Sequence, residues 1–191
     1  MKRLLTYLFL GLFLITPSQA DDIRDFQIEG MSIGDSALDY FSEDEIKNGS
    51  SIFGKDKSIY KIELSSSKIK QYDGIGFYFS KGDKNYIIKG ITAALFFDDF
   101  KKCKQKKKEI EKDVSNIFSS AKKESADYKH PIDKKSLVSQ TTYKSNSMKG
   151  IVSIACYDWH KNIEKNKKWN DHLAIEIYDA DTEYWIRFLA H

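Results

Sequence analysis

Two cysteines, Cys103 and Cys156, are the feature that most constrains the fold of this chain of 191 residues. Cys103 lies in segment 101–121, where apolar residues recur at the spacing of one helix face, and it precedes the first of them by two turns. That apolar stripe consists of Ile110, Val114, Ile117, Phe118 and Ala121. Cys156 alternates with Val152 and Ile154 on one face of a predicted strand. Both cysteines therefore point into one helix–sheet interface, and we predict a Cys103–Cys156 disulfide.

The N-terminus supports this disulfide because it predicts export. Lys2 and Arg3 precede an apolar run of twelve residues, and Ser18-Gln19-Ala20 has the small-x-small pattern of a signal-peptidase site. A transmembrane helix needs about 20 apolar residues, so this run is short for a membrane anchor. We predict that residues 1–20 are a signal peptide, that the mature chain has no transmembrane span, and that it is periplasmic or secreted, where thiols oxidise.

The remaining segment, 21–191, is predicted to form a single α+β domain with a substantial core. Loss of Lys2 and Arg3 reduces the basic residues from 31 to 29, against 28 acidic residues. Only Arg3, Arg24 and Arg187 are arginine, the residue whose planar fork suits phosphate and base recognition. We therefore expect no nucleic-acid partner.

Hydrophobic periodicity predicts an antiparallel sheet of about seven strands with one long and one short helix on one face. The helices are expected within 35–47, with a capping box at Ser42 and Glu45, and at 101–121. A short extended piece is expected at 23–28 and a polar loop at 119–136. The strands are expected at 60–64, 75–79, 85–97, 137–143, 150–159, 172–178 and 184–189.

The long helix begins with KKCKQKKK, six lysines around one cysteine: Lys101, Lys102, Lys104, Lys106, Lys107 and Lys108. The helical stripe directs Cys103 inward and most of these lysines outward, which favours a solvated helix face. Contact with anionic lipid or lipopolysaccharide is the alternative that these lysines leave open.

The chain offers few candidates for catalysis, and we assign it no catalytic residue, no metal site and no cofactor. Asp158 and His160 share a face of one predicted strand, and His172 in the next strand is the candidate third ligand of a metal-dependent or hydrolytic enzyme. The alternation of the later strand places His172 on the opposite face, however. Trp159, Trp169 and Trp185 are either core residues or the lining of a groove for a peptide or lipid.

FQIEGMSIGDSALDYFSEDEI, with CYDWH and WNDHL, resembles a group of small exported proteins from marine bacteria with AT-rich genomes; the resemblance implies no particular activity. EGMSIGDSALDYF is also similar to the start of the first helix in small outer-membrane assembly lipoproteins. The chain departs from that family because it has no lipid-attachment cysteine and no Gly-x-Pro after the helix.

The expectation from the sequence is thus a periplasmic, non-enzymatic protein that binds or supports an envelope component, either a protein or a lipid. An enzyme using Asp158, His160 and His172 is the rival. Convergence of these three residues in one cleft would favour the enzyme.

Overall fold

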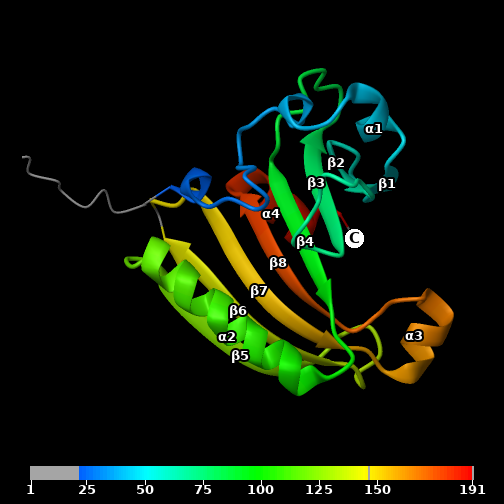
Figure 1. Ribbon diagram of the computed structural model, residues 1–191, viewed down its shortest axis with the longest axis vertical. Helices are drawn as coiled ribbons and strands as arrows, with labels where there is room; N and C mark the ends of the chain where they lie inside the picture. Colours follow the sequence, from blue (N-terminus) through cyan, green and yellow to red (C-terminus); the bar gives the residue numbers. More distant parts are fainter. Residues whose placement is uncertain (1–21, 146, 191) are drawn as a thin grey trace, which may run out of the picture.

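The computed structural model describes residues 22–145 and 147–190, so the predicted signal peptide lies outside the described residues. The fold is α+β, as predicted, and its strands form one antiparallel sheet in the order β1-β2-β3-β4-β8-β7-β6-β5 (Figure 1). The strands are β1 (Ser50–Phe53), β2 (Ile59–Leu64), β3 (Gly74–Ser80), β4 (Gly90–Phe96), β5 (Lys122–Lys129), β6 (Leu137–Ser145), β7 (Gly150–Asp158) and β8 (His172–Asp179). The α-helices are α1 (Glu43–Lys47), α2 (Phe100–Ile117), α3 (Lys161–Lys167) and α4 (Ala180–Phe188).

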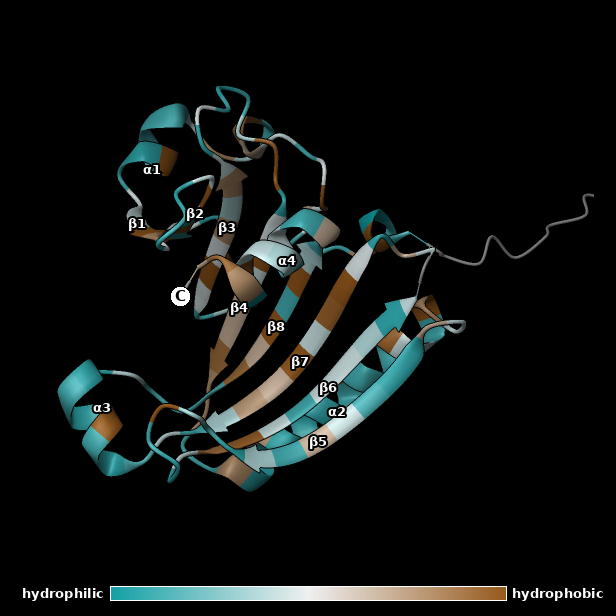
Figure 2. Ribbon diagram, turned by 180° about the vertical axis from the view of Figure 1, so that it is seen from behind, coloured by the Kyte–Doolittle hydropathy of each residue, from teal (hydrophilic) through white to brown (hydrophobic). Residues whose placement is uncertain are grey.

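Different helices cover the two faces of the sheet. The long helix α2 packs on β7 and β8 from one side, and the N-terminal segment with α1 covers the same side, which we call the core face (Figure 1). Helix α4 packs on β7 and β8 from the other side, which we call the groove face (Figure 2). The two predicted helices therefore do share one face, but α3 and α4 were not predicted, and α4 lies on the opposite face.

The main hydrophobic cluster lies between α2, the N-terminal segment and the core face. Val114 of α2 and Phe118, which follows the helix, belong to this cluster. So do Ile154 of β7 and Ile175 of β8, whose side chains point toward the helix. Cys103 and Cys156 are both buried there and form the predicted disulfide, with their Cα atoms 6.0 Å apart. The two periodicities in the sequence thus located this contact between helix and strand correctly.

The N-terminal segment begins with a turn where the sequence suggested an extended piece. Residues Ile23–Asp25 form a short 3-10 helix because the Asp22 side chain accepts a hydrogen bond from Arg24 N, 3.0 Å away, and caps its start. The predicted capping box of the next helix is confirmed. Ser42 Oγ accepts from Glu45 N at 3.2 Å, and Ser42 N donates to the Glu45 carboxylate at 2.8 Å.

Six of the seven predicted strands are present, and both edge strands were missed. All four residues of β1 and all eight residues of β5 are exposed. A strand exposed on both faces needs no apolar alternation, so Lys122–Lys129 has the composition of a loop. The predicted loop at 119–136 is therefore wrong over its central part.

The last predicted strand, at 184–189, is wrong because this segment forms helix α4. The Asp179 side chain caps the helix by accepting from Thr182 N at 2.7 Å. Tyr184 and Phe188 are four residues apart and lie side by side on the helix, with ring centroids 5.0 Å apart.

Candidate binding groove

A hollow of about 680 Å³ opens on the groove face, away from α2. It is lined by residues of β1, β2, β3, β4, β7 and β8, by His130 between β5 and β6, and by the loop between α3 and β8. Because β4 pairs with β8, residues from the N-terminal and C-terminal halves of the chain lie side by side in the groove. Register across β3, β4, β8 and β7 arranges its lining in rows, which lie about 6.6 Å apart along the strands.

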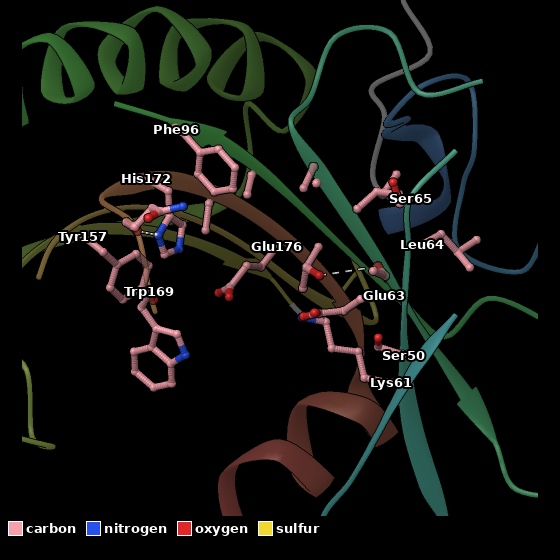
Figure 3. Close-up of a pocket in the computed structure, with 18 of the residues that line it drawn as sticks. Ser50, Lys61, Glu63, Leu64, Ser65, Phe96, Tyr157, Trp169, His172 and Glu176 are labelled. Carbon is pink, nitrogen blue, oxygen red and sulfur yellow. Dashed lines mark hydrogen bonds and ion pairs between the residues drawn. The ribbon is translucent and has the colours of Figure 1, made fainter. Parts of the chain in front are cut away.

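The first row is aromatic. Phe96, His172 and Tyr157 lie opposite one another on β4, β8 and β7. Trp169 from the α3–β8 loop extends this aromatic row (Figure 3). The rings of Tyr157 and His172 stack with centroids 4.8 Å apart.

Trp159 forms the base on which this aromatic row rests. Its ring centroid lies 4.7 Å from that of Trp169 and 5.4 Å from that of Tyr157. Its backbone N–H donates to Asp171 at 2.6 Å, which ties the end of β7 to the loop that carries Trp169. The ring contacts with Trp159 and the hydrogen bond from its backbone to Asp171 therefore hold the aromatic row in place.

The second row consists of residues with small side chains, Gly74, Ala94 and Ala174. These side chains offer no hydrogen-bonding group, and their backbone groups already pair within the sheet. This small row leaves space above the sheet and forms the floor of the groove.

The third row carries Glu176 on β8, paired with Thr92 on β4. Figure 3 shows Glu176 between the aromatic row on one side and Lys61 and Glu63 on the other. Lys61 Nζ pairs with Glu63 at 2.8 Å, and a Cβ at Gly76 would come within 2.5 Å of Lys61 Cε. A glycine at position 76 thus allows the Lys61 side chain to lie flat across the sheet.

Burial determines the protonation of the groups in the groove. It raises the pKa of Glu176, an effect that Lys61 partly offsets. It also lowers the pKa of His172 and of His130, both of which line the groove, so these imidazoles are neutral at pH 7. The groove therefore presents aromatic rings, neutral histidines and a desolvated carboxyl group.

The three residues of the predicted enzyme site do not come together. His172 belongs to the aromatic row and its Nδ1 lies 2.8 Å from Asn170 O. His160 instead caps α3, with Nδ1 accepting from Asn162 N at 3.3 Å. Asp158 has the strand parity of Cys156, which is that of the core face. Within residues 22–145 and 147–190, no group of three or more His, Cys, Asp or Glu side chains could hold a metal ion.

The lysine-rich segment divides into one buried and several exposed side chains. Lys107 is buried and pairs with Glu111 at 2.7 Å, so it is not part of the predicted solvated face. Lys102, Lys104 and Lys106 form ion pairs with Asp98, Asp127 and Glu109 respectively. Lys101 and Lys108 are exposed.

Comparison of the chain with protein-family models, with curated proteins and with solved structures finds no match. The two resemblances noted in the sequence therefore stay predictions. None of the helices in the described part of the chain is long and apolar enough to cross a membrane. Fold and site together define an α+β protein with a groove on the sheet face that α2 leaves open.

Proposed function

We propose that the chain is an exported, periplasmic, non-enzymatic binding protein whose ligand occupies the groove. The observation that carries this proposal is the combination of an open hollow with an exposed aromatic row. The volume, about 680 Å³, falls in the range of about 300–1,000 Å³ that is usual for small-molecule sites. A ligand supplied by the cell envelope would fit the export that the N-terminus predicts.

The exposure of the aromatic row argues against a role in core packing alone. Phe96 is 52% exposed and Trp169 is 39% exposed, so neither side chain is enclosed in the core. Large aromatic side chains that remain accessible in a hollow provide apolar contact area at low cost in conformational entropy. The small row beside them keeps the hollow open.

Substitution of Gly74 by leucine is expected to block the groove without harming the fold. A Cβ at Gly74 would meet only Ala94 Cβ, at 4.0 Å, so a larger side chain can project into the hollow. We expect binding of the neutral aromatic probe N-phenyl-1-naphthylamine, followed by its fluorescence, to weaken at least about tenfold in Gly74→Leu. The melting temperature should be unchanged or higher, because leucine suits a strand better than glycine.

Lys122→Leu provides the matched control, because it adds a leucine to the exposed edge strand β5 and Lys122 does not line the groove. This variant should bind the probe as the wild type does. Equal binding by wild type, Gly74→Leu and Lys122→Leu would place the probe elsewhere and refute the groove as the binding site.

The export part of the proposal predicts that the mature protein begins at Asp21, because the small-x-small site ends at Ala20. N-terminal sequencing of protein from a periplasmic fraction should read Asp-Asp-Ile-Arg. Recovery of chains with an intact Met1 in the membrane fraction would contradict it.

A further inference from the structure

We infer that the ligand of the groove is an elongated organic cation, with an ammonium group that pairs with Glu176 and an apolar body that lies against the aromatic row. The inference rests on the proposed function, because it names the chemistry of the molecule that the groove would bind. It depends on three features of the groove: the spacing of its rows, the composition of its floor and the charges around Glu176.

The spacing of the rows sets the length and polarity of the ligand. Glu176 lies four residues after His172 on the same face of β8, which corresponds to about 13 Å along the strand. Between these two positions the floor is formed by Gly74, Ala94 and Ala174. A ligand that spans the groove therefore meets a polar group at one end, rings at the other and only apolar side chains between them.

The floor also disfavours a polyhydroxylated ligand such as a sugar. Hydroxyl groups above the small row would lose their water without gaining hydrogen-bond partners, which costs free energy for each unpaired group. An alkyl or aryl chain loses nothing in the same place and gains contact with the rings. The middle of the groove thus selects an apolar body.

The charges around Glu176 favour a cation at the polar end. The charged side chains that line the groove are Lys61, Glu63, Lys168 and Glu176. Lys61 forms its ion pair with Glu63, and Lys168 is exposed at the aromatic end, beside Trp169. A ligand ammonium group would give Glu176 an ionic partner through a charge-assisted hydrogen bond.

Protonation of Glu176 links this binding to pH. The groups that interact with Glu176 are Lys61 on β2, Tyr78 on β3, Tyr128 on β5, Tyr157 and Ser153 on β7 and Tyr178 on β8. Burial raises the pKa of all four tyrosines, so they remain neutral. Burial also raises the pKa of Glu176, whereas a bound cation would lower it. Affinity for a cation should therefore fall as the pH is lowered through the titration of Glu176, and binding in that range should release a proton.

The test compares two probes that differ in one group, 4-phenylbutylamine and 4-phenyl-1-butanol, titrated into the mature protein while tryptophan fluorescence is followed. We expect the amine to bind at least about tenfold more tightly than the alcohol at pH 7.5. Glu176→Gln should reduce the affinity for the amine to that for the alcohol and leave the alcohol unchanged. Glu109→Gln, on α2 at the other side of the sheet, is the matched control and should behave as the wild type.

Two results would overturn the inference in distinguishable ways. Equal affinities for amine and alcohol, unaffected by Glu176→Gln but reduced by Gly74→Leu, would refute the cation and leave groove binding intact. Two findings together would refute both the cationic ligand and the proposed function: neither probe binds, and phenylnaphthylamine binds wild type and Gly74→Leu equally well. Thermal unfolding of Glu176→Gln provides the control for the fold: a melting temperature close to that of the wild type would attribute weaker binding to the lost contact with the ligand.

Discussion

Replacement of both cysteines, Cys103→Ser with Cys156→Ser, is expected to lower the free energy of unfolding by about 4 kcal/mol. The bridge joins residues 53 positions apart, and a cross-link that closes a loop of this length restricts the unfolded chain by roughly that amount in the chain-entropy description. For a domain of this size each kcal/mol shifts the melting temperature by about 2–4 °C. We therefore expect a decrease of about 8–16 °C under non-reducing conditions.

The position of the bridge explains why its loss should be felt by the whole fold. Cys103 lies in the first turn of α2, and Cys156 lies in β7, one strand from the centre of the sheet. The loop closed by the bridge contains the rest of α2 and the strands β5 and β6. Without the cross-link, docking of α2 on the core face depends on apolar packing and on side-chain contacts such as those of Lys107 and Glu111 with Thr141.

A second double variant, Cys103→Ala with Cys156→Ala, separates loss of the bridge from burial of serine hydroxyls. Both positions are at most 1% exposed, so serine adds a desolvation cost that alanine does not. Wild-type protein that has been unfolded and reduced should match the alanine variant. Detection of two free thiols in unfolded wild type that has never been reduced would contradict the bridge itself.

The sequence predicted the interior of this fold better than its edges. Cys103 and Cys156 could be placed because a buried helix face and a buried strand face each leave a periodic apolar signal. Strand β5 left no such signal because all its residues are exposed. Helix α4 was misread because its exposed Tyr184 and Phe188 are as apolar as buried residues.

The groove could be predicted only in part. The alternation of β8 correctly assigned His172 to the face opposite Cys156, and the tryptophans suggested a groove as one alternative. Glu176 was not identified, although a single carboxylate between Ile175 and Ile177 was visible in the sequence. Its significance depends on the pairing of β4 with β8, which joins segments about 80 residues apart, and periodicity within a segment carries no information on such pairing.

The lysine-rich segment shows a further limit of periodicity. Lys107 is four residues after Cys103 and therefore lies on the same side of α2, facing the sheet. Its side chain is only 8% exposed, and Nζ contacts Glu111 at 2.7 Å and Thr141 Oγ1 at 2.8 Å. Glu111 is 13% exposed and also pairs with Lys123 at 2.9 Å. Because lysine is usually exposed, the sequence indicated a solvated position for Lys107, although helical geometry places it at the interface between α2 and the sheet.

We expect Lys107→Ala to lower the free energy of unfolding by about 3 kcal/mol, because it removes a buried ammonium group and leaves the half-buried Glu111 carboxylate without one of its two ammonium partners. Lys106→Ala, one position away on the exposed face, should change it by less than about 0.5 kcal/mol. Urea unfolding of the two variants measures both values. Their comparison tests directly whether the lysines of this segment are equivalent.

The pH dependence of the loss in Lys107→Ala should identify Glu111 as its cause. Burial raises the pKa of Glu111, but hydrogen bonds from Lys107, Lys123 and Thr141 more than offset this, so the pKa is lowered in the folded protein. A lowered folded-state pKa stabilises the fold at neutral pH, and this contribution is lost as the pH falls through that pKa. The difference between wild type and Lys107→Ala should therefore shrink in acid. A difference that stays constant from pH 7 into that acid range would instead attribute the loss to missing apolar packing of the lysine stem.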